Sequence, residues 1–195
     1  MNYIIYNIEK LTDTEYEKWF SLMTETKRER VGRYRDATRR KCSVAGEMLV
    51  KEHIGKALNE EPETLIILTN DNGKPYIKDC PIHFNISHCE NMLVLAFSDN
   101  EIGIDIEKIK PISLNVIKRF FSEAEQKYVL GNSFSETDSD IYNTHEIAER
   151  FYKIYTLKEA ICKKSGIGIK GLKNADALPF LDSSLKKNDY IISIV

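Results

Sequence analysis

The sequence has few of the features that mark secreted, membrane-bound or zinc-thiolate proteins. Only four of its 195 residues are cysteines, and none forms a C-x-x-C pair, so neither a zinc site nor a disulfide framework is indicated. No apolar run approaches the length of a membrane span, and the start MNYIIYNIEK lacks the charged and then apolar build of a signal peptide. We therefore expect a soluble protein of the cytoplasm with reduced thiols.

The sequence also has little net charge. With 28 basic and 30 acidic residues the net charge is -2, which argues against a protein with bulk affinity for nucleic acid. Charged residues make up 30% and hydrophobic residues 42%, which is typical of a folded soluble protein rather than a disordered one. A chain of this length can bury a substantial core, either as one domain or as two small lobes.

One strand-like segment carries two carboxylates that a buried strand does not need. In IGIDIEK, residues 102–108, the isoleucines share one face, while Gly103, Asp105 and Glu107 share the other. The two acids stand roughly 7 Å apart at Cβ, so their oxygens could reach one hard divalent cation such as Mg2+. The alternative is an edge or surface strand with one solvated face, because a D-x-E pair alone is weak evidence for a metal site.

The region around this segment predicts three neighbouring strands. IHFNIS, MLVLAFS and IGIDIE are joined by connections short enough to predict an antiparallel meander. The first and third strands of a meander run in the same direction, so Ser87 and His88 are expected at the sheet edge that holds Asp105 and Glu107. Two inter-strand steps separate them by roughly 10 Å, about the width of a pyrophosphate with its metal. By itself, a Ser-His pair at a strand end is more typical of a turn.

The N-terminal part predicts a strand and two helices. Residues 3–8 are strand-like, Thr12 or Asp13 caps a first helix, and a second helix covers about 42–58 with an apolar stripe. Between the two helices lies KRERVGRYRDATRRK, residues 27–41, in which eight residues are basic. This local positive charge contrasts with the slightly acidic total.

A hairpin is expected after the second helix. The runs LIIL and PYI, residues 65–68 and 75–77, flank the segment TNDNGK. Within it, Asn72-Gly73 is a strong turn signal, so the two runs are expected to pair with Lys74 at the tip.

The second half of the chain is mostly helical in pattern. In FFSEAEQKYVL, Ser122 and Glu125 have the spacing of a capping box, which gives Glu125 a structural role. GNSFSETDSD, residues 131–140, predicts a polar loop. A helix over about 144–165 then places its apolar residues on one arc and ends at Gly166.

This last helix carries polar residues beside and within its apolar arc. Tyr155, Glu159 and Lys163 follow one another at four-residue intervals. Glu159 and Lys163 could form an exposed helix ion pair worth a few tenths of a kcal/mol. Lys158 falls inside the apolar arc, where an unpaired ammonium is costly, so either it snorkels to solvent or an anionic ligand lies there. A final strand, YIISIV, ends the sequence.

The motifs together carry a family resemblance. In their order KRER, NGKP, NISH, IGIDIEK with KPISL, KRFFSEAE and LKEA-x-x-K, the sequence resembles the 4'-phosphopantetheinyl transferases, and more narrowly the surfactin-synthetase-activating type. The resemblance implies an α/β (α+β) fold, a pseudo-dimer of two similar lobes that each pack a small antiparallel sheet with helices. Residues 1–100 would form the N-terminal lobe, which binds the nucleotide of coenzyme A. Residues 101–195 would form the C-terminal lobe, with the metal site and the docking surface for a carrier protein.

The resemblance also implies a reaction and roles for its residues. The family transfers the 4'-phosphopantetheine arm of coenzyme A to a serine of an apo acyl or peptidyl carrier protein and releases adenosine 3',5'-bisphosphate. Asp105, Glu107 and Glu159 match the carboxylates that hold Mg2+, or alternatively Mn2+. Lys163 matches a lysine that stabilises or protonates the leaving group. Glu159 is the first candidate for the base that takes the serine proton and Glu125 is the competitor, and the sequence leaves both open.

Other residues match the family's contacts with coenzyme A. Lys27 and Arg30 match cations on the ribose 3'-phosphate, and Ser43 and His88 match residues that assist them. The carrier protein is expected to dock around residues 114–121 and the helix that follows them. The full set of expected coenzyme A contacts is Lys27, Arg30, Ser43, Gly73, Lys74, Pro75, Ser87, His88, Lys158 and Lys163.

The sequence departs from the family pattern in a few places. Tyr155 stands where the family usually has tryptophan, and Cys89-Glu90 replaces small residues after Ser-His. After Gly168 the chain is too short for the family's full C-terminal sheet, so we expect a second lobe that is shortened by a hairpin.

Other functions compete with this interpretation. A Mg2+-dependent phosphohydrolase would use the same acids with water as the nucleophile and would need no carrier surface. A nucleic-acid-binding module built on residues 27–41 would show steep salt dependence but leaves the acids unexplained. The complete set of Asp105, Glu107, Glu159 and Lys163 argues against a homologue that has lost activity. As a pseudo-dimer, the protein is expected to be a monomer that binds neither nucleic acid nor membranes.

Overall fold

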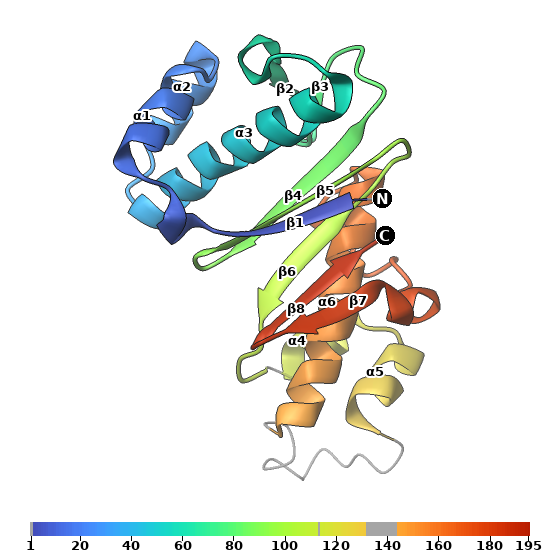
Figure 1. Cartoon of the computed structure of the whole chain (residues 1–195). Coiled ribbons are helices and arrows are strands. Elements are labelled where there is room, and N and C mark those ends of the chain that lie inside the picture. The colour runs from blue at the N-terminus through green and yellow to red at the C-terminus, as the bar shows by residue number, and fades with distance from the viewer. Residues whose placement is uncertain (1, 113, 132–143) are drawn as a thin grey trace. The chain divides into compact units, whose positions relative to one another are not determined.

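A computed structural model describes residues 2–112, 114–131 and 144–195 (Figure 1). The chain forms two compact units, Met1–Ile102 and Gly103–Val195. Each unit packs helices against a small antiparallel sheet, so the α+β fold with two lobes that was expected from the sequence is confirmed. Apart from Gly131, the polar loop expected at residues 131–140 lies outside the described residues.

The first unit contains five strands and three α-helices among its described residues. The strands are β1 (Asn2–Asn7), β2 (Ile67–Thr69), β3 (Pro75–Ile77), β4 (His83–Cys89) and β5 (Met92–Ser98). The α-helices are α1 (Asp13–Ser21), α2 (Glu25–Gly32) and α3 (Ala37–Leu58), with short 3-10 helices at Ile8–Lys10 and Pro62–Thr64. The sheet has the order β1-β5-β4, with α3 lying across one face, and β2 and β3 form the expected separate hairpin (Figure 1).

Local side-chain chemistry sets the helix starts in this unit. Thr12 caps α1 in a complete capping box with Glu15, which confirms one of the two caps expected from the sequence. The start of α3 near residue 42 was predicted wrongly, because α3 begins five residues earlier. Asp36 caps it by accepting a hydrogen bond from the backbone nitrogen of Thr38 at 2.8 Å. The start of α3 carries the basic residues Arg39, Arg40 and Lys41, so the apolar periodicity does not reveal it.

The expected three-stranded meander is wrong for its third strand. β4 and β5 pair antiparallel as predicted, but the other edge of β5 pairs with β1, from Asn2 opposite Phe97 to Asn7 opposite Met92. Because β1 occupies that edge, β6 (Ile104–Lys108) pairs instead with β8 (Tyr190–Ile194) in the second unit. Ser87 and His88 therefore belong to a different sheet from the acids of β6, and the common sheet edge does not exist.

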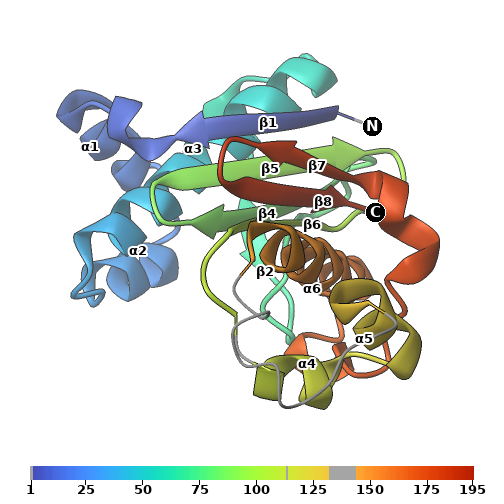
Figure 2. The same ribbon diagram turned by 90° about the horizontal axis from the view of Figure 1, so that it is seen from below.

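The second unit is built around one long helix. Its α-helices are α4 (Leu114–Phe120), α5 (Glu123–Leu130) and α6 (His145–Ser165), and β7 (Ser184–Lys187) completes a sheet with the order β6-β8-β7. Short 3-10 helices lie at Ile169–Gly171 and Leu178–Ser183. Helix α6 packs along one face of this sheet (Figure 2), starts after its cap Thr144 and ends at Gly166, as expected.

The residues that the structure describes add two negative findings. None of their helices combines the length and the apolar character needed to cross a membrane. All four cysteines are free thiols, and two of them, Cys42 and Cys162, are buried.

A glycine allows β6 to lie directly against α6. A Cβ atom added at Gly103 would overlap the carbonyl oxygen of Ala160 and lie 2.7 Å from the backbone nitrogen of Lys164. No larger residue can occupy this position without moving the strand away from the helix. Asp105 lies two residues further on the same face of the strand, so this close approach brings its carboxylate to α6.

We expect Gly103→Ala to destabilise the protein, because the new methyl group meets backbone atoms that no side-chain rotation can move. The loss should reach about 3 kcal/mol, at the upper end of the range for overpacked cores. Gly32→Ala is the matched control, because Gly32 ends α2 with no atom within 4 Å of its added Cβ. The measurement is the urea concentration at the midpoint of unfolding of each variant. Equal midpoints for the two variants would contradict the close packing at Gly103.

Candidate functional site

A pocket in the first unit gathers six of the ten residues expected to contact coenzyme A. It has a volume of about 210 Å³ and lies where α2, α3, β4 and the hairpin of β2 and β3 meet. Helix α2 supplies two cations spaced three residues apart, so both project from one side of the helix. The six residues are Lys27, Arg30, Ser43, Gly73, Pro75 and His88.

The Ser-His pair at the end of β4 is divided between the two faces of its strand. His88 is exposed and lines the pocket, whereas Ser87 is 7% exposed and is not among the residues that line it. Strand alternation puts neighbouring side chains on opposite faces, so the sequence alone contained the signal that separates them.

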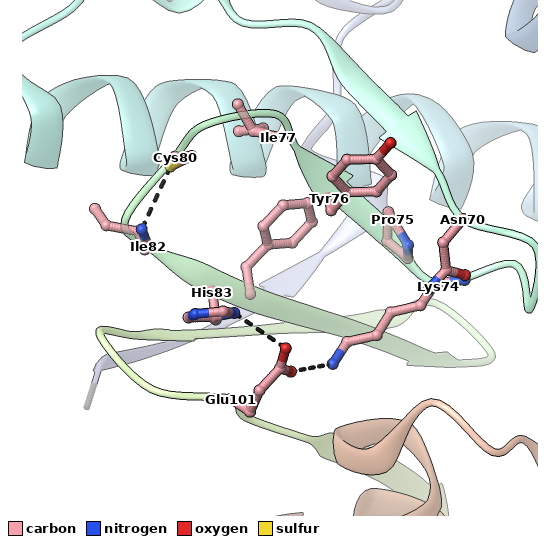
Figure 3. A pocket seen from close by; sticks show the side chains of 10 residues that line it. Asn70, Lys74, Pro75, Tyr76, Ile77, Cys80, Ile82, His83 and Glu101 are labelled. Atoms are coloured by element: carbon pink, nitrogen blue, oxygen red, sulfur yellow. Dashed lines mark hydrogen bonds and ion pairs between the residues drawn. The ribbon is translucent and has the colours of Figure 1, made fainter.

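Lys74 belongs to a second cavity on the same hairpin. This cavity has a volume of about 360 Å³, and its lining combines apolar residues of β3 and β4 with Lys74, His83 and Glu101. Figure 3 shows Lys74 and His83 both reaching the carboxylate of Glu101, with His83 Nδ1 at 3.2 Å. The hydrogen bond from Lys74 is the main reason that the pKa of Glu101 is lowered. Lys74 therefore shares the turn of Gly73 and Pro75, but its ammonium is directed to Glu101.

Sequence reasoning missed two residues in or beside the first pocket. Glu47 of α3 lines the first pocket, and its carboxylate forms an ion pair with the ammonium of Lys27. Lys51, one turn further along α3, lies 3.2 Å from the same carboxylate. The signal was a charged pair at i and i+4 inside the apolar run VAGEMLVK, where acids and lysines are rarely buried unless they are paired.

The second unit brings the expected metal carboxylates to α6. Asp105 and Glu107 lie on β6, and Glu159 and Lys163 lie on α6. Asp105 is 3% exposed and accepts a hydrogen bond from Lys163 Nζ at 2.6 Å. At Asp105 the strand face that carries the acids is thus covered by the helix rather than solvated.

The charges of this cluster act on one another. Burial raises the pKa of Glu159, the nearby charge of Asp105 raises it further, and Lys163 together with a hydrogen bond from Tyr155 opposes the shift. Burial likewise raises the pKa of Tyr155, and the charges of Glu159, Glu107 and Asp105 add to that effect. All three carboxylates therefore lie near the one phenol.

The carboxylates of this cluster are suitable ligands for a divalent cation, although the described side chains are not gathered closely enough to coordinate one. Within residues 2–112, 114–131 and 144–195, no three His, Cys, Asp or Glu side chains lie close enough together to hold a metal ion. Carboxylate oxygens are nevertheless the ligands that Mg2+ prefers. Burial and, in addition, the charge of Asp105 raise the pKa of Glu159, and a bound cation would favour the ionised carboxylate instead. The Mg2+ site stays a prediction.

Glu125 and Lys158 form a buried ion pair. Lys158 Nζ lies 3.0 and 2.8 Å from the two carboxylate oxygens of Glu125 and also donates to the carbonyl of Ala175. Glu125 accepts further hydrogen bonds from the backbone nitrogens of Ser122 and Ala177, at 2.7 and 3.0 Å, which confirms the capping box. The anion opposite Lys158 is thus a carboxylate of the chain, rather than the ligand or the snorkelling that the sequence suggested.

This pair bears on two expected site residues. Glu125 is 0% and Lys158 is 1% exposed, and both already have partners within the second unit. A base has to come within hydrogen-bond reach of the serine proton. The structure therefore favours a structural role for both residues, and we rank Glu159 ahead of Glu125 as the base.

An apolar groove adjoins the acidic cluster. It has a volume of about 310 Å³ and runs from Glu107 to side chains at the start of α4 and on α6. Two of its lining residues, Phe151 and Tyr155, stack with ring centroids 5.8 Å apart. The other residues that line it are Pro111, Ile112, Val116 and Tyr152.

We expect Lys158→Met to destabilise the protein by about 3–5 kcal/mol, because it leaves the buried carboxylate of Glu125 without its cation. The double variant Lys158→Met/Glu125→Gln removes both charges and should recover part of the loss. Urea unfolding of the two variants provides the measurement. An unfolding midpoint of Lys158→Met equal to that of the wild type would contradict the assigned structural role.

Comparisons with known proteins cover both units. The family model described as 4'-phosphopantetheinyl transferase, N-terminal, matches residues 10–100, and the model of the 4'-phosphopantetheinyl transferase superfamily matches residues 101–191. The 4'-phosphopantetheinyl transferase Sfp of Bacillus subtilis (strain 168) is 35% identical over 168 residues, covering 86% of this chain and 70% of the relative.

More distant relatives carry the same activity in their names. The 4'-phosphopantetheinyl transferase gsp of Aneurinibacillus migulanus is 32% identical over 127 residues, which are 65% of this chain and 49% of the relative. The L-aminoadipate-semialdehyde dehydrogenase-phosphopantetheinyl transferase of Rattus norvegicus is 29% identical over 156 residues, which are 76% of this chain and 50% of the relative.

Proposed function

Because the chain belongs to the 4'-phosphopantetheinyl transferase superfamily, we propose that it transfers the 4'-phosphopantetheine arm of coenzyme A to a serine of an apo acyl or peptidyl carrier protein. The observation that carries this proposal is the 35% identity to a transferase across 86% of the chain. The two family models, which meet at residues 100 and 101, support it independently.

The first unit is assigned to the nucleotide of coenzyme A. Its pocket presents Lys27, Arg30 and His88 around a space into which the hydroxyl-bearing Ser43 also opens. The two cations Lys27 and Arg30 at one small cavity suit a dianionic phosphate, so we assign the ribose 3'-phosphate to it. Gly73 and Pro75 form its other wall, where the adenosine would lie.

The second unit is assigned to the chemistry. Attack of the serine oxygen on the β-phosphorus of coenzyme A breaks a P–O bond of the pyrophosphate and leaves adenosine 3',5'-bisphosphate. Asp105, Glu107 and Glu159 would hold Mg2+, which when bound neutralises charge on the pyrophosphate. Lys163, which donates to Asp105, supplies a further cation for the leaving bisphosphate. We assign acceptance of the serine proton to Glu159 rather than to Glu125, whose carboxylate is bound in the buried pair with Lys158.

The carrier protein is assigned to the groove beside Glu107 and to the start of α4. The groove is apolar and about 310 Å³ in volume, so it suits part of the phosphopantetheine arm or an apolar side chain of the carrier. Lys118 and Arg119 are exposed on α4 next to it, and cations there favour an acidic partner.

We expect an apo acyl or peptidyl carrier protein to gain the mass of one phosphopantetheinyl group when it is incubated with this protein, coenzyme A and Mg2+. Asp105→Asn removes a metal carboxylate with little change of shape. Its rate should fall by at least the roughly 10–100-fold that loss of an outer partner costs at metal sites. Intact mass spectrometry measures both.

Three results count against the proposal, the first two from control measurements made beside that experiment. Release of adenosine 3',5'-bisphosphate without any carrier would indicate the phosphohydrolase instead. Failure of the wild-type protein to bind coenzyme A would remove the substrate altogether. A transfer rate that is unchanged in Asp105→Asn would dissociate the reaction from the acids of β6.

We expect Mg2+ to stabilise the protein more strongly as the pH rises. The pKa of Glu159 lies above the ordinary value of 4.5, so in the metal-free protein its contribution to stability is present below that pH and is lost as the pH rises. Mg2+ binds the ionised form and therefore reverses this loss. Thermal unfolding with and without Mg2+, at acidic and neutral pH, measures the increment in unfolding temperature that Mg2+ produces. In Glu159→Gln the increment should be smaller and should depend less on pH; an identical increment would exclude Glu159 as a ligand.

A further inference from the structure

The pocket assigned to the ribose 3'-phosphate contains a carboxylate in its wall. Glu47 lines this pocket, yet it is only 2% exposed. A negative charge beside a phosphate site weakens binding of the phosphate by direct repulsion. Its presence in a pocket that is otherwise rich in cations therefore requires a physical reason.

Glu47 is held between two lysines of different exposure. Its Oε2 pairs with Lys27 of α2, and its Oε1 lies 3.2 Å from Lys51 Nζ on its own helix. Lys51 also donates to the carbonyl of Leu22 at 3.0 Å, so its ammonium is bound on two sides. The side chain of Lys51 is 3% exposed, whereas that of Lys27 is 18% exposed.

This arrangement leaves one effective positive charge at a fixed place. The charge of Lys51 offsets that of Glu47, so the group keeps the single charge of Lys27, the more exposed of the three side chains. A free lysine loses about 2 kcal/mol of rotamer entropy when it is immobilised. A lysine already held in place loses less when a ligand binds, so pre-organisation raises affinity. Arg30, three residues along α2, is exposed and lies in the same pocket.

We propose that Glu47 is a positioning residue that holds the ammonium of Lys27 toward the phosphate pocket, and that it thereby sets the preference of the protein for coenzyme A over 3'-dephospho-coenzyme A. Lys51 compensates the charge of Glu47 and ties α3 to the end of α1. This inference rests on the proposed function. It extends that function by assigning the choice between two related substrates to a carboxylate that acts through Lys27.

The proposal makes a prediction opposite to that of simple electrostatics. If Glu47 acted only through its charge, its removal would strengthen the binding of an anionic ligand. If it positions Lys27, its removal weakens binding of the ligand that carries the 3'-phosphate and leaves the other ligand alone. The double variant Glu47→Gln/Lys51→Met separates the two effects, because it removes one negative and one positive charge and keeps the total charge constant.

Isothermal calorimetry of coenzyme A and 3'-dephospho-coenzyme A tests the proposal without metal or carrier. We expect the double variant to bind coenzyme A about tenfold more weakly and to bind 3'-dephospho-coenzyme A as the wild type does. In a Lys27→Met background the same double change should have no further effect, because Glu47 acts through Lys27. Glu29→Gln removes the same charge from an exposed carboxylate of α2, 58% exposed, and should leave the preference unchanged.

The outcomes are distinct. A loss confined to coenzyme A, absent in the Lys27→Met background, supports the positioning role. Equal weakening of both ligands reports general damage to the unit, and unchanged or tighter binding of coenzyme A reports simple electrostatics; each of these overturns the inference. If the wild type binds neither ligand, the proposed function fails first and the inference fails with it.

Discussion

The second unit depends on the close approach of one strand to one helix. At Gly103, the residue directly before β6, the backbone meets that of α6 with no room for a side chain between them. Asp105 is therefore buried against the helix, where Lys163 can donate to it at 2.6 Å and where its charge acts on Glu159. The carboxylate pattern of the strand and the polar stripe of the helix become one cluster only because a glycine stands two residues before the first acid.

Both units bury a carboxylate with lysine, and the pairs differ in what they leave exposed. In the second unit, Glu125 and Lys158 are enclosed together and hold α5, α6 and the segment around Ala177 in place. In the first unit, Glu47 is buried while Lys27 keeps 18% of its side chain exposed. Breaking a buried pair costs more than its formation gains, so both pairs fix geometry rather than add much stability. The first pair differs because the half-buried ammonium side chain of Lys27 lines a pocket, where a ligand can meet it.

The sequence predicted those features that local chemistry determines. The strand of IGIDIEK, the helix ending at Gly166 and the capping box of Ser122 and Glu125 all follow from short-range patterns, and the structure contains each of them. The resemblance to the transferase family is confirmed by the comparisons over most of the chain. The roles assigned to single residues remain predictions.

What the sequence could not supply was the choice of long-range partners. A connection of a few residues between β5 and β6 allowed them to be neighbours, but β1, from the far end of the unit, occupies that edge of β5 instead. The anion opposite Lys158 was equally hidden, because Glu125 lies 33 positions away and has a sufficient local explanation as a helix cap. In both cases the local pattern was satisfied by more than one tertiary arrangement.

The pairing of β6 with β8 explains how a sheet of three strands can hold the acids in place. Asp105 stands opposite Ser193 of β8, which is 0% exposed. The hydroxyl of Ser193 lies 2.6 Å from that of Thr156 on α6 and 2.7 Å from that of Ser184 on β7. The buried hydroxyls of Thr156 and Ser193 and the half-buried hydroxyl of Ser184 satisfy one another and join α6, β8 and β7 at the level of Asp105. The strand that carries the acids is thus held between a helix at Gly103 and a hydrogen-bonded neighbour strand, so three strands are sufficient to fix it.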